Sequence, residues 1–419
     1  MRVRDAVPQV GLRASVLLLV TGVVVLAVNL RASITGLPPV FPELQSALHV
    51  SASTLALLAA MPVLCFGVFS GAGAPLSRQF GEERVLGLAL GLLALGLLLR
   101  SLSPSLLLFP GTIVAGAAIS LMNVLLPSLV KRRAPERAGV LIGVYLLMLT
   151  AGAVVASLIA VPVFNAVGGG ETAGSAAVRI SLGLWAVPAL VAALLWVPQL
   201  LFRTRPAEAV TAGARPPRTR SRRGPLSMGR SRLAWQVTLF MGLQSLSYYA
   251  TLSWFPTMFR DRGVSAVHAG ELLALMNLGN AATALLIPVI AHRSADQRWL
   301  AAVANIATAA GLAGAIFGPA SAAIPFILLL GLGQGATLGL GVFYTMARAP
   351  DPVTAASLSA FAQGIGYLIA SVGPLVVGFL HDATGGWTVP GLVLLVVAAL
   401  QLLTGWLAGR DETVPGLGS

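Results

Sequence analysis

One arginine lies inside the first long apolar stretch of this 419-residue chain, and its position is the strongest indication of chemistry. Arg31 follows Asn29 by two residues, so a cation and an amide share one turn of a predicted helix. A charge at membrane depth is costly and generally marks a substrate or ion site. A guanidinium presents five N–H donors in a plane, which suits a carboxylate, another small anion, or a polarised nitro or carbonyl group. Arg31 therefore predicts a central binding site.

Two other interpretations of Arg31 stay open at the level of sequence. Its side chain could extend to the outer membrane surface, or it could form an ion pair with Glu43 at the end of the same stretch. Arg31 lies past the centre of the stretch, but helical side chains lean toward the helix N-terminus. That lean returns the guanidinium toward the middle of the membrane, so we favour the central site.

Other polar side chains within apolar stretches are candidates to share this site. Gln244 and Tyr248 are four residues apart, as are Gln363 and Tyr367, so each pair lies on one helix face. A hydrogen bond between packed helices is an equal alternative for any of them. Tyr249 and Tyr344 are expected to serve packing. The predicted substrate-binding residues are Arg31, Asn29, Asn123, Tyr145, Gln244, Tyr248, Asn277, Gln334, Gln363 and Tyr367, with Asn280 as a further candidate.

The elements that must position these residues are membrane-spanning helices. Hydrophobic residues make up 57% of the chain, charged residues only 10%, and the mean hydropathy is +0.87. We count twelve apolar runs, the shortest between Arg84 and Arg100, most of them long enough for the roughly 20 helical residues that cross a bilayer. They are too evenly apolar for barrel strands. The predicted fold is an all-α integral membrane protein with twelve transmembrane helices in two six-helix bundles.

The basic residues predict the orientation of these helices. If the N-terminus is cytoplasmic, 22 of the 27 basic residues lie on the cytoplasmic side, and only Arg100, Arg179, Arg260 and Arg262 lie outside. The positive-inside rule selects that topology. We expect a bacterial-type plasma (inner) membrane protein with both termini in the cytoplasm. The net charge of +13 is then a topology signal and an attraction to anionic lipids, not to nucleic acid.

A basic segment divides the chain into halves of similar length. Residues 203–232 hold nine arginines and a Pro216-Pro217 pair without aromatic residues, which predicts a solvated cytoplasmic linker near anionic lipid headgroups. The predicted domains are a six-helix bundle at 1–202, a second at 233–409 and a tail at 410–419. Cys65, the only cysteine, is expected to be a packed apolar residue.

Several local sequences carry a family resemblance. The segments Asn29–Arg31, Asn123–Arg133, Gly242–Ser245 and Leu358–Tyr367 resemble the cyanate and 2-nitroimidazole transporter branch of the major facilitator superfamily. The connector Ala74–Arg84 resembles a degenerate form of that superfamily's loop between its second and third helices. The resemblance runs from about Leu30 to Trp387. It implies two bundles with a site between them, spans 1, 4, 7 and 10 lining the cavity, and movement of small molecules.

Missing residue types narrow the function further. No Asp or Glu occurs well inside a predicted span, and no nucleophile, acid–base pair or metal set is visible there, so neither an enzyme nor a cofactor is expected. A channel would need a repeated filter or a charged ring. We expect a monomeric secondary transporter of a small polar, anionic or electron-rich solute. Multidrug efflux on the same fold is the alternative, and a receptor or scaffold is a third; uniport, exchange and symport all stay open.

Overall fold

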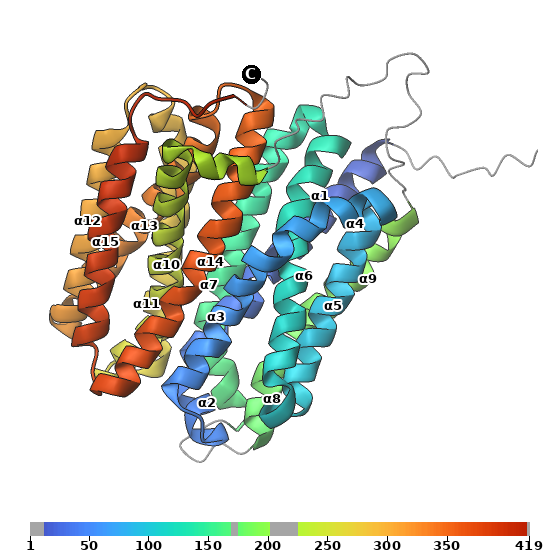
Figure 1. Ribbon diagram of the computed structural model, residues 1–419. Coiled ribbons are helices and arrows are strands. Elements are labelled where there is room, and N and C mark those ends of the chain that lie inside the picture. The colour runs from blue at the N-terminus through green and yellow to red at the C-terminus, as the bar shows by residue number, and fades with distance from the viewer. Residues whose placement is uncertain (1–11, 169–174, 202–224, 417–419) are drawn as a thin grey trace, which may run out of the picture.

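The computed structural model describes residues 12–168, 175–201 and 225–416, and within these ranges it contains helices and no strands (Figure 1). The α-helices are α1 (Leu12–Thr35), α2 (Phe41–Leu48), α3 (Ala52–Phe69), α4 (Gly73–Phe80), α5 (Glu82–Leu102), α6 (Pro104–Arg133), α7 (Ala138–Ala166), α8 (Ser175–Gly183), α9 (Ala186–Leu201), α10 (Arg232–Asp261), α11 (Ala266–Ala291), α12 (Arg298–Phe317), α13 (Ala323–Ala347), α14 (Pro352–Thr384) and α15 (Thr388–Ala408).

The predicted all-α transmembrane fold is confirmed. Eleven helical segments of the described chain are long and apolar enough to cross a membrane, including the short third span, which is now the 21-residue α5. The twelfth, α10, has 30 residues but is more polar. Most residues of α10 are buried, so its polar side chains face protein rather than lipid. That burial explains why a helix of this length has a modest hydropathy.

The helices form two groups that meet along two extensive helix pairs (Figure 1). Helices α1–α9 pack mainly on one another, as do α10–α15, while α3 packs on α14 and α7 packs on α11 across the boundary. Small residues allow this approach: a Cβ on Gly378 would lie 2.5 Å from the Cβ of Ala56, and one on Gly270 would lie 2.6 Å from the carbonyl oxygen of Ser157. Larger side chains at these glycines would separate the two bundles.

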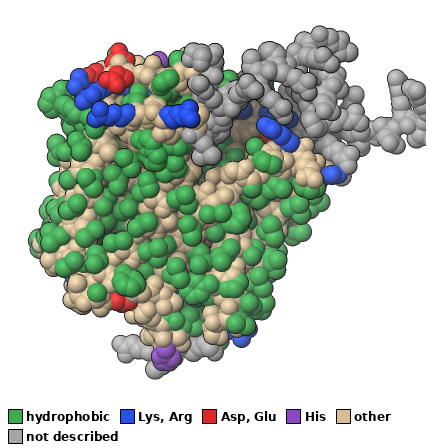
Figure 2. Space-filling model, in the orientation of Figure 1, with side chains coloured by type: hydrophobic (Ala, Val, Ile, Leu, Met, Phe, Trp, Pro, Cys, Tyr) green, Lys and Arg blue, Asp and Glu red, His purple; other side chains and the backbone are tan. Residues whose placement is uncertain are grey.

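The outer surface has the character of a protein that contacts lipid. Figure 2 shows apolar side chains over the long sides of the molecule and charged side chains gathered at its two ends. We call the end that carries the C-terminus and the start of α10 the linker end, and the opposite one the far end. Leu106 is 74% exposed and Val140 is 71% exposed, which is costly in water but favourable against hydrocarbon.

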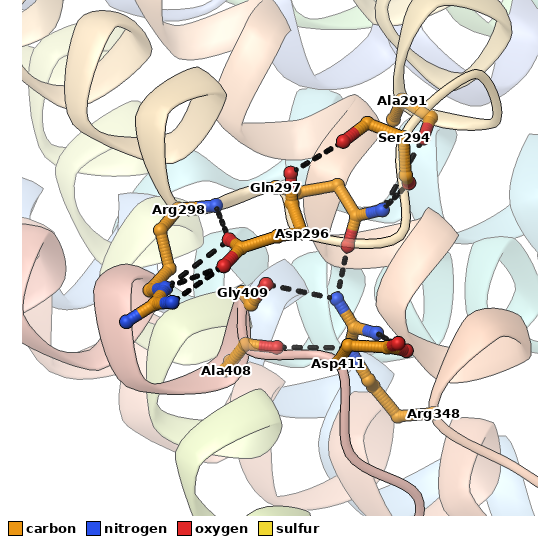
Figure 3. A network of polar contacts seen from close by, with 9 residues as sticks. All are labelled: Ala291, Ser294, Asp296, Gln297, Arg298, Arg348, Ala408, Gly409 and Asp411. Atoms are coloured by element: carbon orange, nitrogen blue, oxygen red, sulfur yellow. Dashed lines mark hydrogen bonds and ion pairs between the residues drawn. The ribbon is translucent and has the colours of Figure 1, made fainter.

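A buried arginine ties together the linker end of the second bundle (Figure 3). Arg348, at the end of α13, is 2% exposed. Its Nε donates to the carbonyl oxygen of Ala408 at 3.0 Å, and its Nη2 donates to that of Gly409 at 3.1 Å and to the side chain of Gln297. Asp411 lies 3.9 Å away. Burial lowers the pKa of Arg348, and these partners compensate for its desolvation.

Ion pairs hold the start of α5 against the end of α6. Gly81 has a φ of 87°, a conformation that glycine adopts without strain, and α5 begins directly after it. Glu83 then pairs with Arg133 at 2.7 Å, and Glu82 pairs with Arg132 at 3.1 Å. These pairs fix the linker end of the first bundle.

The predicted linker lies largely outside the described residues. Its last part, Pro225–Arg230, forms a short 3₁₀ helix that packs on α14, and Met228 there is 3% exposed. In the tail, the amide of Val414 donates to the carbonyl oxygen of Arg348 at 2.8 Å. The exact domain boundaries and the lipid contact of residues 203–232 stay predictions.

Candidate substrate-binding site

Arg31 reaches from the first bundle to the second. Its Nη1 donates to the hydroxyl oxygen of Tyr249 in α10 at 3.3 Å. The guanidinium carbon lies 5.5 Å from the ring centroid of Tyr248 and 5.7 Å from that of Tyr249, within the range of cation–π attraction. The side chain as a whole is half-buried. The charge therefore lies where the two bundles face each other.

Helix α10 presents two consecutive tyrosines to this cation. Their rings meet edge to face with centroids 5.2 Å apart. The hydroxyl of Tyr248 donates to Oδ1 of Asn277 in α11 at 2.8 Å, and the amide nitrogen of Asn277 donates to the carbonyl oxygen of Leu273 at 2.9 Å. This chain of bonds fixes the Tyr248 ring and leaves the hydroxyl of Tyr249 for Arg31.

Two further predicted tyrosines, Tyr145 in α7 and Tyr367 in α14, lie in the same region of the molecule. Tyr145 of α7 donates to Oδ1 of Asn123 in α6 at 3.2 Å, and Tyr367 of α14 packs edge to face on Phe66 at 5.5 Å. Tyr248 and Tyr249 are thus the tyrosines that the structure brings into contact with Arg31. Their ring faces and hydroxyls can hold a planar or polar solute beside the cation.

No carboxylate in the described part of the chain pairs with Arg31. The proposed ion pair with Glu43 is wrong, because Glu43 pairs with Arg260 of α10 at 2.7 Å. The outward position is also wrong, since the guanidinium lies against Tyr248 and Tyr249. A membrane-embedded cation without a protein counter-charge favours an anionic or electron-rich ligand.

The structure does not bring every predicted residue to this group. Asn29 donates to the carbonyl oxygens of Val25 at 2.8 Å and Pro188 at 3.2 Å, so its amide faces α9. Gln363, one helical turn before Tyr367, donates to the hydroxyl of Ser359 at 2.7 Å. Both amides are therefore occupied by local or packing contacts.

Gln244, Gln334 and Asn280 belong to the interior of the second bundle. The side chain of Gln334 in α13 donates to the hydroxyl of Thr251 at 3.1 Å, and that of Gln244 donates to the carbonyl oxygen of Gln334 at 3.4 Å. Asn280 is 9% exposed, and its amide nitrogen has no partner in the described chain. These residues form a polar seam between α10 and its neighbours rather than a wall of the Arg31 site.

Sequence reasoning missed two residues. Tyr249 was expected to serve packing, but its hydroxyl accepts from Arg31. The four-residue spacing placed Tyr248, and not Tyr249, on the helix face of Gln244, so the helical pattern gave no sign of this contact. Arg100, expected at the outer surface, is 2% exposed. Its position at the end of an apolar run looked like an ordinary membrane boundary, so the sequence carried no signal of its burial.

Two helical bundles with a polar site at their boundary define a membrane transporter of the secondary type. The model of the Major Facilitator Superfamily matches residues 23–374, and the chain belongs to this family. The chain is 39% identical to the 2-nitroimidazole transporter of Escherichia coli (strain K12) over 95% of its own length and 97% of the relative's. It is 31% identical to the cyanate transport protein CynX of the same organism, over 91% and 94% of the two chains.

The fold is shared with solved transporters at much lower sequence identity. A crystal structure of a bacterial homolog of the human lysosomal transporter Spinster, inward-facing and unoccupied, superposes with a TM-score of 0.76 at 18% identity. The match covers 96% of this chain and 99% of that one. The family match and its curated relatives, together with this fold, make the chain a secondary transporter of the major facilitator fold, as predicted, and not an enzyme.

Proposed function

We propose that this protein transports a small anionic or electron-rich solute by alternating access, through a central site built on Arg31. One observation carries the proposal: the Arg31 guanidinium lies between the bundles, in contact with Tyr248 and Tyr249 and without a carboxylate partner in the described chain. The solute itself then supplies the negative charge or the electron-rich group that this cation lacks. The relatives named for 2-nitroimidazole and cyanate suggest solutes of that size and chemistry.

The site is shared between bundles, which is what alternating access requires. Arg31, Tyr145 and Asn123 belong to the first bundle, whereas Tyr248 and Tyr249 belong to the second. A solute that contacts both groups would favour the arrangement in which they are closest, because a ligand shifts an equilibrium only through its different affinity for the two states. Binding and closure are thereby coupled.

The distribution of basic residues supports a cytoplasmic position for the linker end. Most arginines of the described loops lie at that end, and the far end has few. We therefore place the protein in the bacterial inner membrane with both termini cytoplasmic, as the positive-inside rule requires. The Glu43–Arg260 pair, 2.7 Å long, then lies on the outer side, where it joins the two bundles.

Uptake into proteoliposomes tests the proposal. The purified protein is assayed with radiolabelled cyanate, 2-nitroimidazole, and a cationic drug as the probe for multidrug efflux. We expect transport of at least one of the first two and none of the cation. Arg31→Gln should abolish uptake, and Arg31→Lys should retain a fraction of it, since lysine keeps the charge but loses the planar fork of donors.

Arg293→Gln is the matched control, because it removes an exposed arginine at the linker end and leaves the site intact. Its uptake should equal that of the wild type. Full activity of Arg31→Gln would contradict the proposed site, and selective transport of the cationic drug would instead support efflux.

A further inference from the structure

Arg100 is a second membrane-embedded cation without a counter-charge. It lies near the end of α5, is 2% exposed, and forms no ion pair with any described carboxylate. Its Nε donates to the carbonyl oxygen of Leu182 in α8 at 3.3 Å. Its Nη2 is buried and has no partner in the described chain. A buried guanidinium with an unused donor is costly unless a ligand satisfies it.

A cavity lies against Arg100, lined on its polar side by Ser33, Thr112, Tyr249 and Ser253. Its volume is about 20 Å³, and a single water molecule needs roughly 10–15 Å³. The space thus admits a compact ion but no aromatic solute. The cavity joins elements of both bundles, since Tyr249 and Ser253 belong to α10.

The donors around this cavity select an anion. The hydroxyls of Ser33, Thr112 and Ser253 already donate to carbonyl oxygens of their own helices, at 2.9, 2.7 and 2.8 Å. Each has a single proton, so none is left for a ligand. The guanidinium of Arg100, a residue that lines the cavity, donates in the described chain only through its Nε, and the hydroxyl of Tyr249 accepts from Arg31 and donates to no described acceptor.

Tyr249 connects this cavity to the central site. It lines the cavity and also holds Arg31 through the 3.3 Å bond. The other lining residues include Leu37, Pro38 and Phe41, which follow Arg31 toward the far end of the molecule. The cavity therefore lies between the far end and the Arg31 site, with Tyr249 common to both.

We propose that Arg100 and Tyr249 form a second anion subsite, which holds a compact monovalent anion between the far end and Arg31. In this arrangement the anion accepts hydrogen bonds from the guanidinium of Arg100. Tyr249 then passes the anion from one arginine to the other. The order of the two subsites along the transport route rests on the proposed function, whereas binding at Arg100 does not.

Bromide is the probe that locates the subsite directly. Crystals of the full-length protein are soaked in sodium bromide, and anomalous density is recorded. We expect a bromide in contact with the Arg100 guanidinium of the wild type, also present in Arg100→Lys and Arg31→Gln and lost in Arg100→Gln. Arg179→Gln, which removes an exposed arginine at the same end, should keep the ion. A wild type without bromide at Arg100, or an Arg100→Gln variant that retains it, would overturn the subsite.

Transport kinetics test the order of the two subsites. For cyanate entering from the far end, Arg100→Gln should raise KM about tenfold, because it removes one charge-assisted contact. The Arg179→Gln control should leave KM unchanged. An unaltered KM in Arg100→Gln would overturn the place of Arg100 on the route. The bromide experiment needs no transport, so failure of the proposed function would not be mistaken for absence of the subsite.

Discussion

Tyr249 joins the cation of one bundle to the framework of the other, and its hydroxyl is the part that does so. Tyr249→Phe keeps the ring beside Arg31 but removes the oxygen that accepts its proton at 3.3 Å. A hydrogen bond to a charged group contributes about 1.5–3 kcal/mol, so we expect KM for 2-nitroimidazole to rise roughly tenfold or more. Uptake kinetics in proteoliposomes provide the measurement.

Tyr344→Phe is the matched control at the residue scale. Tyr344 is also fully buried, but its hydroxyl has no partner in the described chain and it packs on Phe240, 5.6 Å away. Removing that hydroxyl should leave KM unchanged. Equal KM values for Tyr249→Phe and the wild type would show that the Arg31 contact contributes nothing to binding.

At the scale of elements, the position of Arg31 depends on how closely α1 packs on α7. A Cβ on Gly152 of α7 would overlap the carbonyl oxygen of Val28, one turn before Arg31. Gly152→Val should therefore displace α1, lower the Tm by several degrees and reduce uptake strongly. Gly143→Val is the control, because nothing lies within 4 Å of the site of its Cβ. A stable, fully active Gly152→Val protein would contradict this packing argument.

Element-scale patterns also explain what the sequence could predict. The membrane itself dictates the apolar runs and the clusters of arginines. The spanning helices, and a charge at Arg31 within one of them, could therefore be predicted from the sequence. Which face a polar residue presents is set by neighbouring helices instead. Asn29 faces α9 and Gln334 faces α10, although both lie at plausible depths. Arg100 ends an apolar run, so the sequence indicated a residue at the membrane boundary. Its burial results from the packing of α8, a segment distant in the sequence, over it.

At the scale of the whole molecule, the far end is held shut by contacts between the bundles. The carboxylate of Asp382 in α14 accepts from the backbone N–H of Ser53 in α3 at 2.7 Å and from its hydroxyl. Transport by alternating access requires this contact to break in each cycle. A disulfide between Ser53→Cys and Asp382→Cys, in a Cys65→Ala background, should stop uptake on oxidation and restore it on reduction.

The single-cysteine proteins are the controls for this cross-link. Neither Ser53→Cys alone nor Asp382→Cys alone should respond to oxidation, because Cys65 is the only native cysteine and is replaced. Undiminished uptake by the fully cross-linked protein would show that the far end does not need to open.

If Arg31 binds the transported solute, its loss must weaken the equilibrium binding of 2-nitroimidazole to the purified protein. This solute is too large for the cavity at Arg100, so its binding reports the central site alone. We expect Arg31→Gln to weaken binding at least tenfold relative to the wild type, with Arg31→Lys in between. Wild-type protein that binds 2-nitroimidazole with the same affinity as Arg31→Gln would contradict this role of Arg31.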